Sequence, residues 1–264
     1  MNVMDLLSLK GKVALVTGGS GKYGSQITEA LAEAGATVIT ASRSLEKNEA
    51  FAAALREKGY DAHGETYDQA DEASIVALKD RILEKFGRLD VLVNNSVLRG
   101  QFTGGFFGDS DGFARSLDIN GRGFFVMTRT MGTIMEKQKS GSIINIGSYM
   151  GMLGPNQNLY AGTGGTMGGW GGADYYYHKG GMHQFTRFLA AYYGEFNVRC
   201  NCLSLGGLFN NQHPAFVEEY SKACYIHRLA NQDDIKGIIV YLASDASAYT
   251  TGTVIPVDGG YSAR

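Results

Sequence analysis

The sequence predicts an α/β fold: a doubly wound, Rossmann-type parallel sheet of seven strands with helices on both faces. Short apolar runs, typical of buried strands, alternate with segments of helical periodicity from one end of the chain to the other. This βαβ alternation implies a parallel sheet covered on both sides, because the crossovers between its strands are right-handed. No linker divides the sequence, so we expect residues 1–264 to form one domain.

The expected elements follow one another in order, and Gly35, Gly59 and Gly87 end the first three helices. Gly121 and Gly123 lie inside the fourth helix and weaken it by about 1 kcal/mol each relative to alanine. The expected strands cover residues 13–16, 37–40, 61–66, 89–93, 142–146, 198–203 and 253–257. The expected helices cover residues 27–34, 45–58, 73–86, 112–137, 175–193 and 233–243.

Composition excludes several classes of protein. The net charge is −2 and no basic run occurs, which argues against a nucleic-acid partner. We expect no membrane partner and no signal peptide, because no run of about 18 apolar residues exists and residues 1–9 lack a positive start before an apolar stretch. The odd cysteine total (Cys200, Cys202, Cys224) suits reduced thiols in the cytoplasm. None has a His or Cys at ligand spacing, so we expect no metal site.

A glycine-rich segment at about residues 151–174 interrupts the pattern and surrounds Trp170, the only tryptophan. Loops of this length without regular structure are usually functional or mobile. Because the segment directly precedes the helix that begins near Tyr175, we expect it to be an insertion beside the reaction centre.

A glycine-rich turn, Thr17 to Gly24, follows the first strand and opens the first helix. Glycines allow the backbone to approach a diphosphate closely, and the helix N-terminus supplies free N–H groups and a positive dipole end. A plain βα turn is the alternative, but the position in the first βα unit favours a dinucleotide site. The cofactor-binding residues expected here are Gly18, Gly19, Ser20, Gly21, Lys22, Tyr23 and Gly24.

The end of the second strand indicates which dinucleotide is bound. An acidic residue there would bind the ribose 2′-hydroxyl of NAD. This chain has Ser42 and Arg43 instead, which suit a 2′-phosphate, and Lys22 adds positive charge from the turn. We therefore favour NADP(H) as cofactor. NAD(H) is the alternative, in which Arg43 only stacks on the adenine.

Tyr175 and Lys179 stand four residues apart, and Ser148 lies upstream at the end of a strand. Residues at i and i+4 share one face of a helix, so the ammonium can lie beside the phenol. A neighbouring positive charge favours the phenolate of a tyrosine, whose ordinary pKa is about 10. Such a tyrosine can exchange a proton with a substrate oxygen near neutral pH. Most Tyr-x-x-x-Lys pairs are surface contacts, so the pattern gains weight only from the rest of the chain.

Taken together, these motifs resemble those of the classical short-chain dehydrogenase/reductase family, over residues 9–261. The resemblance rests on motifs that occur in the family's order: the turn at 17–24, Asp68, Asn94-Asn95, Asn120, Ser148, Tyr175 with Lys179, and residues 257–260. It implies an NAD(P)-dependent oxidoreductase that interconverts a secondary alcohol and a ketone. It also implies a homotetramer or homodimer formed through the long fourth helix and the tyrosine helix.

The resemblance assigns roles to single residues. Tyr175 would be the general acid/base, Lys179 would lower its pKa and hold the nicotinamide ribose, and Ser148 would bind the substrate oxygen. Asn120 would fix a water in a proton relay. Asp68 would accept a hydrogen bond from the adenine amino group. The remaining cofactor residues expected are Asn94, which would support the adenosine side, and Gln69, Ser96 and Gly206.

The chain departs from the family pattern at several points. Lys22 replaces a glycine of the turn, Ser96-Val97 replaces Ala-Gly, and Leu205 replaces proline. In addition, 26 residues separate Ser148 from Tyr175, more than the family usually has. Tyr160 lies nearer the usual distance and is a rival for the base, although Gly164 stands where its lysine would be.

The family uses the segment after the sixth strand, here residues 207–214, as a substrate lid. Asn210 in this lid, with Asn156 and Trp170 in the insertion, are the substrate-binding residues we expect. Amides and an aromatic plane suit a small polyhydroxylated molecule: a sugar, a polyol or a cyclic hydroxy-ketone. The alternative is that the amides are ordinary loop residues and that the substrate is a hydrophobic ketone or a 3-oxoacyl thioester.

Two other classes of function use the same fold. A dinucleotide-binding regulator without turnover would need no proton-transfer residues, so the presence of Ser148, Tyr175, Lys179 and Asn120 speaks against it. An epimerase or dehydratase would carry a larger C-terminal substrate domain, which the sequence does not indicate.

Overall fold

The computed structural model describes residues 2–165 and 172–263. Its centre is a sheet of seven parallel strands in the order β3-β2-β1-β4-β5-β6-β7, which confirms the doubly wound Rossmann topology. The strand order reverses between β1 and β4. At such a switch point, the loops that follow the strands diverge and leave a crevice outside their carboxyl ends. The topology therefore fixes where a ligand can bind.

The strands agree closely with those predicted. They are β1 (Val13–Thr17), β2 (Thr37–Ser42), β3 (Ala62–Thr66), β4 (Val91–Asn94), β5 (Gly141–Ser148), β6 (Val198–Leu205) and β7 (Val254–Val257). Every residue of β1 and β4 is buried, as expected for strands covered on both faces. The two longest strands, β5 and β6, pair in register over eight residues, so Ser148 lies opposite Leu205 at the carboxyl edge.

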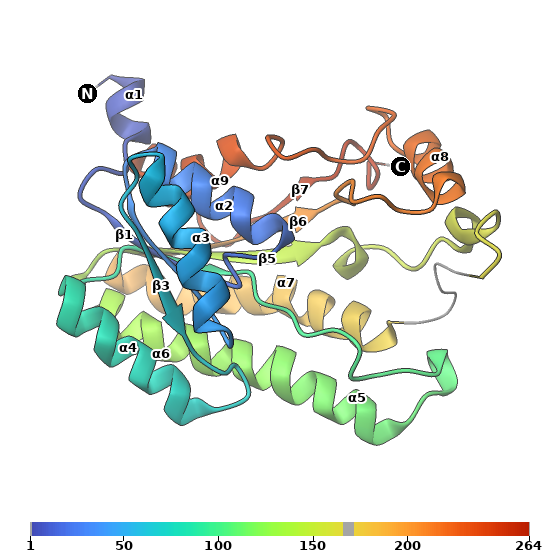
Figure 1. The fold of residues 1–264 in the computed structure, drawn as a ribbon, viewed down its shortest axis with the longest axis horizontal. Coiled ribbons are helices and arrows are strands. Elements are labelled where there is room, and N and C mark those ends of the chain that lie inside the picture. Colours follow the sequence, from blue (N-terminus) through green and yellow to red (C-terminus); the bar gives the residue numbers. More distant parts are fainter. Residues whose placement is uncertain (1, 166–171, 264) are drawn as a thin grey trace.

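Helices cover both faces of the sheet (Figure 1). One face carries α2 (Lys22–Glu33), α3 (Leu45–Glu57) and α9 (Lys236–Ala243), which share a hydrophobic cluster with the sheet. The other carries α4 (Glu72–Phe86), α6 (Gly123–Gln138) and α7 (Ala173–Tyr193), which enclose a second cluster. The remaining helices are α1 (Val3–Leu7), α5 (Ser110–Leu117) and α8 (Pro214–Ala223). No helix in the described ranges is both long enough and apolar enough to cross a membrane.

The structure corrects one helix prediction and adds two α-helices that were not predicted, α1 and α8. The helix expected over residues 112–137 is two helices, α5 and α6, joined by the π-helical turn Asp118–Arg122. Gly121 lies in this π-helical turn, so it does not lower the stability of an α-helix. The turn also carries Asn120, and π-turns within helices are frequent at functional sites. Of the two added helices, α1 is capped by reciprocal hydrogen bonds between Asn2 and Asp5 and has no apolar period that would predict it.

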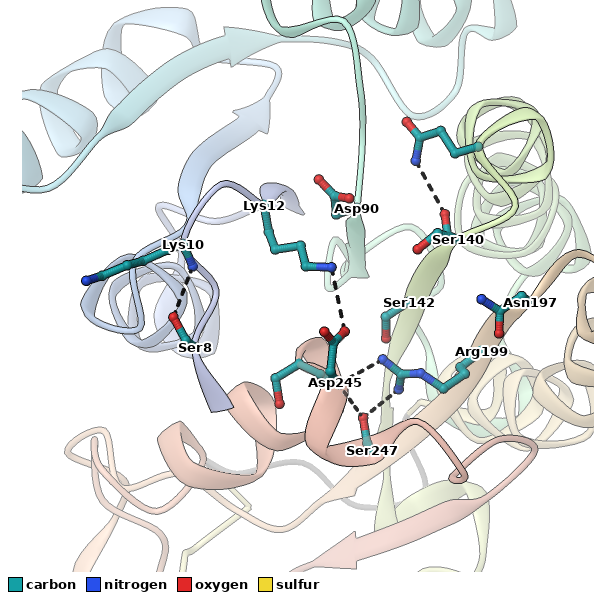
Figure 2. Close-up of polar contacts among 12 residues, drawn as sticks. Ser8, Lys10, Lys12, Asp90, Ser140, Ser142, Asn197, Arg199, Asp245 and Ser247 are labelled. Atoms are coloured by element: carbon teal, nitrogen blue, oxygen red, sulfur yellow. Dashed lines mark hydrogen bonds and ion pairs between the residues drawn. The ribbon is translucent and has the colours of Figure 1, made fainter. Parts of the chain in front are cut away.

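Polar contacts hold the opposite, amino edge of the sheet together (Figure 2). Arg199 of β6 donates to the carbonyls of Leu242 and Ser244, at 2.9 and 3.1 Å, and to the hydroxyl of Ser247 at 2.6 Å. Lys12, just before β1, pairs with Asp245 at 3.6 Å. The Arg199 guanidinium therefore satisfies carbonyls at the C-terminal end of α9 that the helix itself leaves without partners. These bonds anchor α9 to the sheet far from the carboxyl edge.

We predict that Gly132→Ala lowers the free energy of unfolding by an amount on the order of 1 kcal/mol. A Cβ at Gly132 in α6 would lie 1.9 Å from the hydroxyl of Tyr193, a buried side chain of α7. Overpacking typically costs about 1–3 kcal/mol, more than the gain of about 1 kcal/mol from replacing a helical glycine. Urea denaturation measures the difference.

Gly181→Ala is the matched control. Gly181 lies in α7, is exposed, and has open space around the position of a Cβ. This variant should gain stability, by up to about 1 kcal/mol. Equal effects of the two substitutions would show that the packing of α6 on α7 does not require a glycine.

Candidate active site

A cleft of about 1020 Å³ lies at the carboxyl edge of the sheet. Most residues predicted for the site line it: Gly18, Ser20, Gly21, Lys22, Tyr23, Gly24, Ser42, Arg43, Asp68, Gln69, Ser96, Ser148, Tyr175, Lys179, Gly206 and Asn210. Four others are not among its lining residues: Gly19, Asn94, Asn120 and Asn156. Trp170 lies outside the described residues. Residues scattered over the sequence thus meet in one place.

The glycine-rich turn has the geometry of a diphosphate cradle. Gly18 has a positive φ of 63°, and a Cβ on Gly24 would lie 2.1 Å from the carbonyl oxygen of Gly18. The N-cap of α2 is Gly21, whose missing side chain leaves the helix uncapped. The first N–H groups of α2 therefore have neither an intrahelical partner nor a side-chain cap. They fit the oxygens of a dinucleotide diphosphate, as does the positive end of the helix dipole.

A buried asparagine that the sequence analysis missed organises the end of β2. Asn48 in α3 accepts hydrogen bonds from the hydroxyls of Ser20 and Ser42, at 2.8 and 3.0 Å. Its amide donates to the carbonyls of Ser42 and Glu65. Asn48 thus joins the glycine turn to the ends of β2 and β3. No local pattern could have indicated this, because its partners are distant in sequence.

Three cations line the cleft near the end of β2: Lys22, Arg43 and Lys47. Lys47 was not predicted, although it lies one turn after Arg43 at the start of α3. Among the described residues, no carboxylate forms an ion pair with any of the three. This end of the cleft can therefore receive an anionic group.

Two adjacent asparagines at the end of β4 point to different places. Asn94 is buried and its amide donates to Thr128 in α6 and to Asn145 in β5, at 3.0 and 2.9 Å. Asn95 lines the cleft, and its amide donates to the carbonyls of Thr17 and Gly18. Asn95, rather than Asn94, therefore joins β4 to the glycine turn.

Tyr175 and Lys179 come together on the inner face of α7. Lys179 is buried, its Nζ donates to the carbonyl of Ile146 at 2.6 Å, and Nζ lies 5.5 Å from the centre of the Tyr175 ring. Burial raises the pKa of Tyr175, but the positive charges of Lys179 and Arg99 and hydrogen bonds with Ser148 and Arg99 outweigh it. The pKa of Tyr175 is therefore below its ordinary value, as a general acid/base requires.

Arg99 is a further residue of the site that was not predicted from the sequence. Its guanidinium carbon lies 4.3 Å from the centre of the Tyr175 ring, a cation–π contact, and it lines the cleft. Arg99 belongs to an irregular segment between β4 and α5, where sequence periodicity carries no information. It therefore went unpredicted, although it contributes directly to the lowered pKa of Tyr175.

Asn120 fixes the segment that carries Arg99. Its side-chain oxygen accepts from the N–H of Leu98 and its amide donates to the carbonyl of Leu98, both at 2.8 Å. The amide also reaches Ser116, whose hydroxyl donates to Asp174 at the start of α7. Both polar groups of Asn120 are thus engaged by protein. A buried chain of hydrogen bonds links the tyrosine helix to the neighbour of Arg99.

The rival tyrosine, Tyr160, also lines the cleft but has a different environment. It ends the 3₁₀ turn Gln157–Tyr160, and its ring centre lies 5.5 Å from that of Phe216. Burial raises the pKa of Tyr160, and the charge of Arg99 only partly opposes this. Of the two tyrosines, Tyr175 has the lowered pKa and the lysine.

The expected lid forms a turn followed by α8. Gln212 accepts from the N–H of Asn210 and donates to the carbonyl of Leu208, so the turn closes on itself. His213 is the N-cap of α8. Asn156 accepts from the N–H of Asn158 and caps a 3₁₀ turn, which is an ordinary loop role. Within the described residues, no group of three or more His, Cys, Asp or Glu could hold a metal ion.

Comparisons with known proteins agree with this geometry. A family model described as "Enoyl-(Acyl carrier protein) reductase" matches residues 23–262. The chain is 32% identical over 269 residues to the sorbose reductase SOU1 of Candida albicans, covering 99% of this chain and 90% of that protein. It is 30% identical over 264 residues to a 7alpha-hydroxysteroid dehydrogenase of Clostridium sardiniense, covering 96% and 94%.

The similarity extends to solved structures. A gluconate 5-dehydrogenase from Burkholderia cenocepacia J2315, crystallised in complex with NADP and tartrate, superposes with a TM-score of 0.89 at 26% identity over 100% of both chains. The fold and the family match define a Rossmann-type oxidoreductase that uses NAD(P) and acts on CH–OH groups. The chain belongs to the classical short-chain dehydrogenase/reductase family.

Proposed function

We propose that this enzyme interconverts a secondary alcohol and a ketone on a small polyhydroxylated substrate, with NADP(H) as cofactor and Tyr175 as general acid/base. The observation that carries the proposal is the lowered pKa of Tyr175, held among Lys179, Arg99 and Ser148 in the cleft. When bound, the cofactor supplies or accepts the hydride.

The cofactor's phosphates match the positive groups of the cleft. The glycine turn and the N-terminus of α2 would hold the diphosphate. Lys22, Arg43 and Lys47 would hold the 2′-phosphate, since they are the cations near the end of β2. The structural neighbour solved with NADP supports this choice. NAD(H) is the alternative, and it would leave these three charges without an anion.

Proton transfer follows from the contacts of Tyr175. In reduction, the Tyr175 hydroxyl gives its proton to the substrate oxygen, and the Ser148 hydroxyl donates a hydrogen bond to the same oxygen. Lys179 stabilises the phenolate that remains, and its charge acts strongly because the ammonium is buried. In oxidation the phenolate takes the alcohol proton back. Asn120, which we expected to fix a water, would act here mainly through Leu98.

Several observations favour a polar substrate. Asn210, Gln212, Tyr149 and Tyr160 all line the cleft. These groups can pair with the hydroxyls of a sugar or polyol. The relatives named for sorbose and gluconate support the same class. The steroid-dehydrogenase relative supports the alternative, a hydrophobic ketone, for which the aromatic rings of Tyr149 and Phe216 would form the wall.

We further propose that the chain assembles into a homotetramer or homodimer through α6 and α7. The outward face of these helices carries Phe125, Phe188 and Tyr192, each more than two-fifths exposed. Phe185 stacks on Phe188 with ring centres 5.4 Å apart and also contacts Phe125, so the exposed rings form one apolar strip. Covering this strip would remove it from water.

We also propose a cytoplasmic location. The three cysteines Cys200, Cys202 and Cys224 are buried and form no disulfides. Burial raises the pKa of the Cys202 thiol to about 12, so this thiol is unreactive. Buried thiols without disulfides are typical of a reducing compartment.

We predict that Tyr175→Phe lowers kcat by about 10²–10⁴, the usual contribution of a general acid/base. The variant should bind NADPH within about twofold of the wild-type affinity in a fluorescence titration, because the ring remains. Tyr160→Phe is the matched control and should keep most of the activity. The opposite result, an active Tyr175→Phe and an inactive Tyr160→Phe, would move the base to Tyr160.

We predict that substitutions at Arg43 change the cofactor preference in two steps. Arg43→Gln should lower the ratio of kcat/KM for NADP to that for NAD by about tenfold, because a charged hydrogen bond contributes about 1.5–3 kcal/mol. Arg43→Asp should lower it further, because a carboxylate repels the 2′-phosphate and accepts from a ribose hydroxyl. Steady-state kinetics with both cofactors measure the ratio. An unchanged ratio in both variants would exclude Arg43 from cofactor selection.

We predict that Arg99→Gln shifts the rising limb of the pH profile for alcohol oxidation to higher pH. Oxidation needs Tyr175 deprotonated, and the lowered pKa keeps it so at lower pH. Removing one of the two cations near the phenol raises that pKa, so activity appears later as pH increases. The charged groups that face the phenol are Lys179 and Arg99. Arg115→Gln, on the outside of α5, is the control and should leave the limb in place.

A further inference from the structure

We propose that Arg99 binds a carboxylate of the substrate, so that the natural substrates are polyhydroxylated hydroxy acids and keto acids. The inference rests on the proposed function and narrows its substrate class. Three independent features of the structure carry it: the position of the guanidinium, the charge balance of the cleft, and the way the Arg99 segment is held.

Arg99 lies where a bound substrate would contact it. Its guanidinium carbon lies 4.3 Å from the centre of the Tyr175 ring. The reacting oxygen must reach the Tyr175 hydroxyl. A group bound to the guanidinium therefore lies within a few bonds of the reacting carbon. Arg99 is also exposed to the cleft, so its remaining N–H donors are available to a ligand.

Among the described residues, Arg99 has no carboxylate partner in the cleft. The only carboxylate among the residues that line it is Asp68, which follows β3 on the adenosine side and accepts from the N–H of Ala70. No Asp or Glu of the described chain pairs with Arg99. An unpaired guanidinium at the reaction centre matches a planar carboxylate.

Arginines nearby but outside the cleft behave differently. Arg115 pairs with Asp109, Arg122 with Asp118 and Arg129 with Glu72. Each of these three arginines thus has a carboxylate partner, whereas Arg99 at the reaction centre has none in the part of the chain that the structure describes. In the proposed complex the substrate supplies that partner.

The segment that carries Arg99 is fixed relative to the tyrosine. Asn120 binds both the N–H and the carbonyl of Leu98, and the chain through Ser116 ends on Asp174, next to Tyr175. Three of these bonds are 2.5 to 2.8 Å long. A substrate anchor needs such support, because binding energy is lost when the anchor must be ordered first. Asn120 is therefore a positioning residue for Arg99.

The test uses two ketones that differ at one carbon. 5-Keto-D-gluconate has a carboxylate where L-sorbose has a hydroxymethyl group, and the rest of the molecule is the same. Reduction of each with NADPH is measured for the wild type, Arg99→Gln, Arg99→Lys and the control Arg115→Gln. We expect the wild type to prefer the keto acid. We expect Arg99→Gln to reduce that preference about tenfold to a hundredfold, mainly through KM, while Arg99→Lys retains part of it.

The ratio of the two substrates reports the anchor, and a comparison without turnover separates it from any effect of Arg99 on the proton transfer at Tyr175. Titration calorimetry of both ketones into enzyme saturated with NADP⁺, which cannot reduce them, gives the same comparison without turnover. There the keto acid should bind more tightly than sorbose, and Arg99→Gln should remove the difference.

The possible outcomes distinguish failure of the carboxylate anchor from failure of the proposed function. If Arg99→Gln leaves the preference unchanged, or if the wild type prefers sorbose in both kinetics and binding, the carboxylate anchor is overturned. An equal loss for both ketones with a raised KM for NADPH would assign Arg99 to the cofactor instead. If neither these nor other ketones are reduced with either cofactor, the proposed function fails, and the calorimetry alone then decides whether Arg99 binds a carboxylate.

Discussion

The site depends on one buried charge, the ammonium of Lys179. Burial lowers the pKa of Lys179, because water no longer solvates its charge, and its contact with Tyr175 opposes this. The carbonyl of Ile146 at 2.6 Å provides a second compensation. Ile146 lies in β5 and Tyr175 in α7, so the charge is both buried and compensated only when β5 and α7 are packed. The fold and the chemistry are coupled through this side chain.

The second level of organisation is a buried polar chain that reaches the cleft only at its end, Leu98. It runs from Asp174 through Ser116 and Asn120 to the backbone of Leu98. Its members come from α7, α5, the π-helical turn and the segment after β4. Each would be costly to bury alone, and together they satisfy one another. The result is that Tyr175 and the neighbour of Arg99 keep a fixed relation, although 76 positions separate 99 from 175 in the sequence.

The sequence predicted those parts of the site whose geometry is local. The glycine turn and the Tyr175–Lys179 pair each lie within a short stretch of sequence, so residue spacing determines their geometry. Asn48 and Arg99 were missed because their contacts depend on how distant segments pack. The contrasting surroundings of Asn94 and Asn95 could not be predicted either. The alternation of side chains along a strand shows which face of the sheet a residue occupies only once the end of the strand is known. The seven strands were predictable because buried parallel strands are continuous apolar runs.

In the proposed complex, Arg99 would also connect substrate binding with proton transfer. Without an anion, its charge helps to lower the pKa of Tyr175. A carboxylate on the guanidinium neutralises that charge, so the phenol regains affinity for its proton, while the buried Lys179 still favours the phenolate. In reduction the enzyme must hold a protonated Tyr175 when the keto acid binds and a stabilised phenolate after the proton has left. A substrate that brings its own negative charge assists the first requirement. The lysine, which the substrate does not neutralise, meets the second.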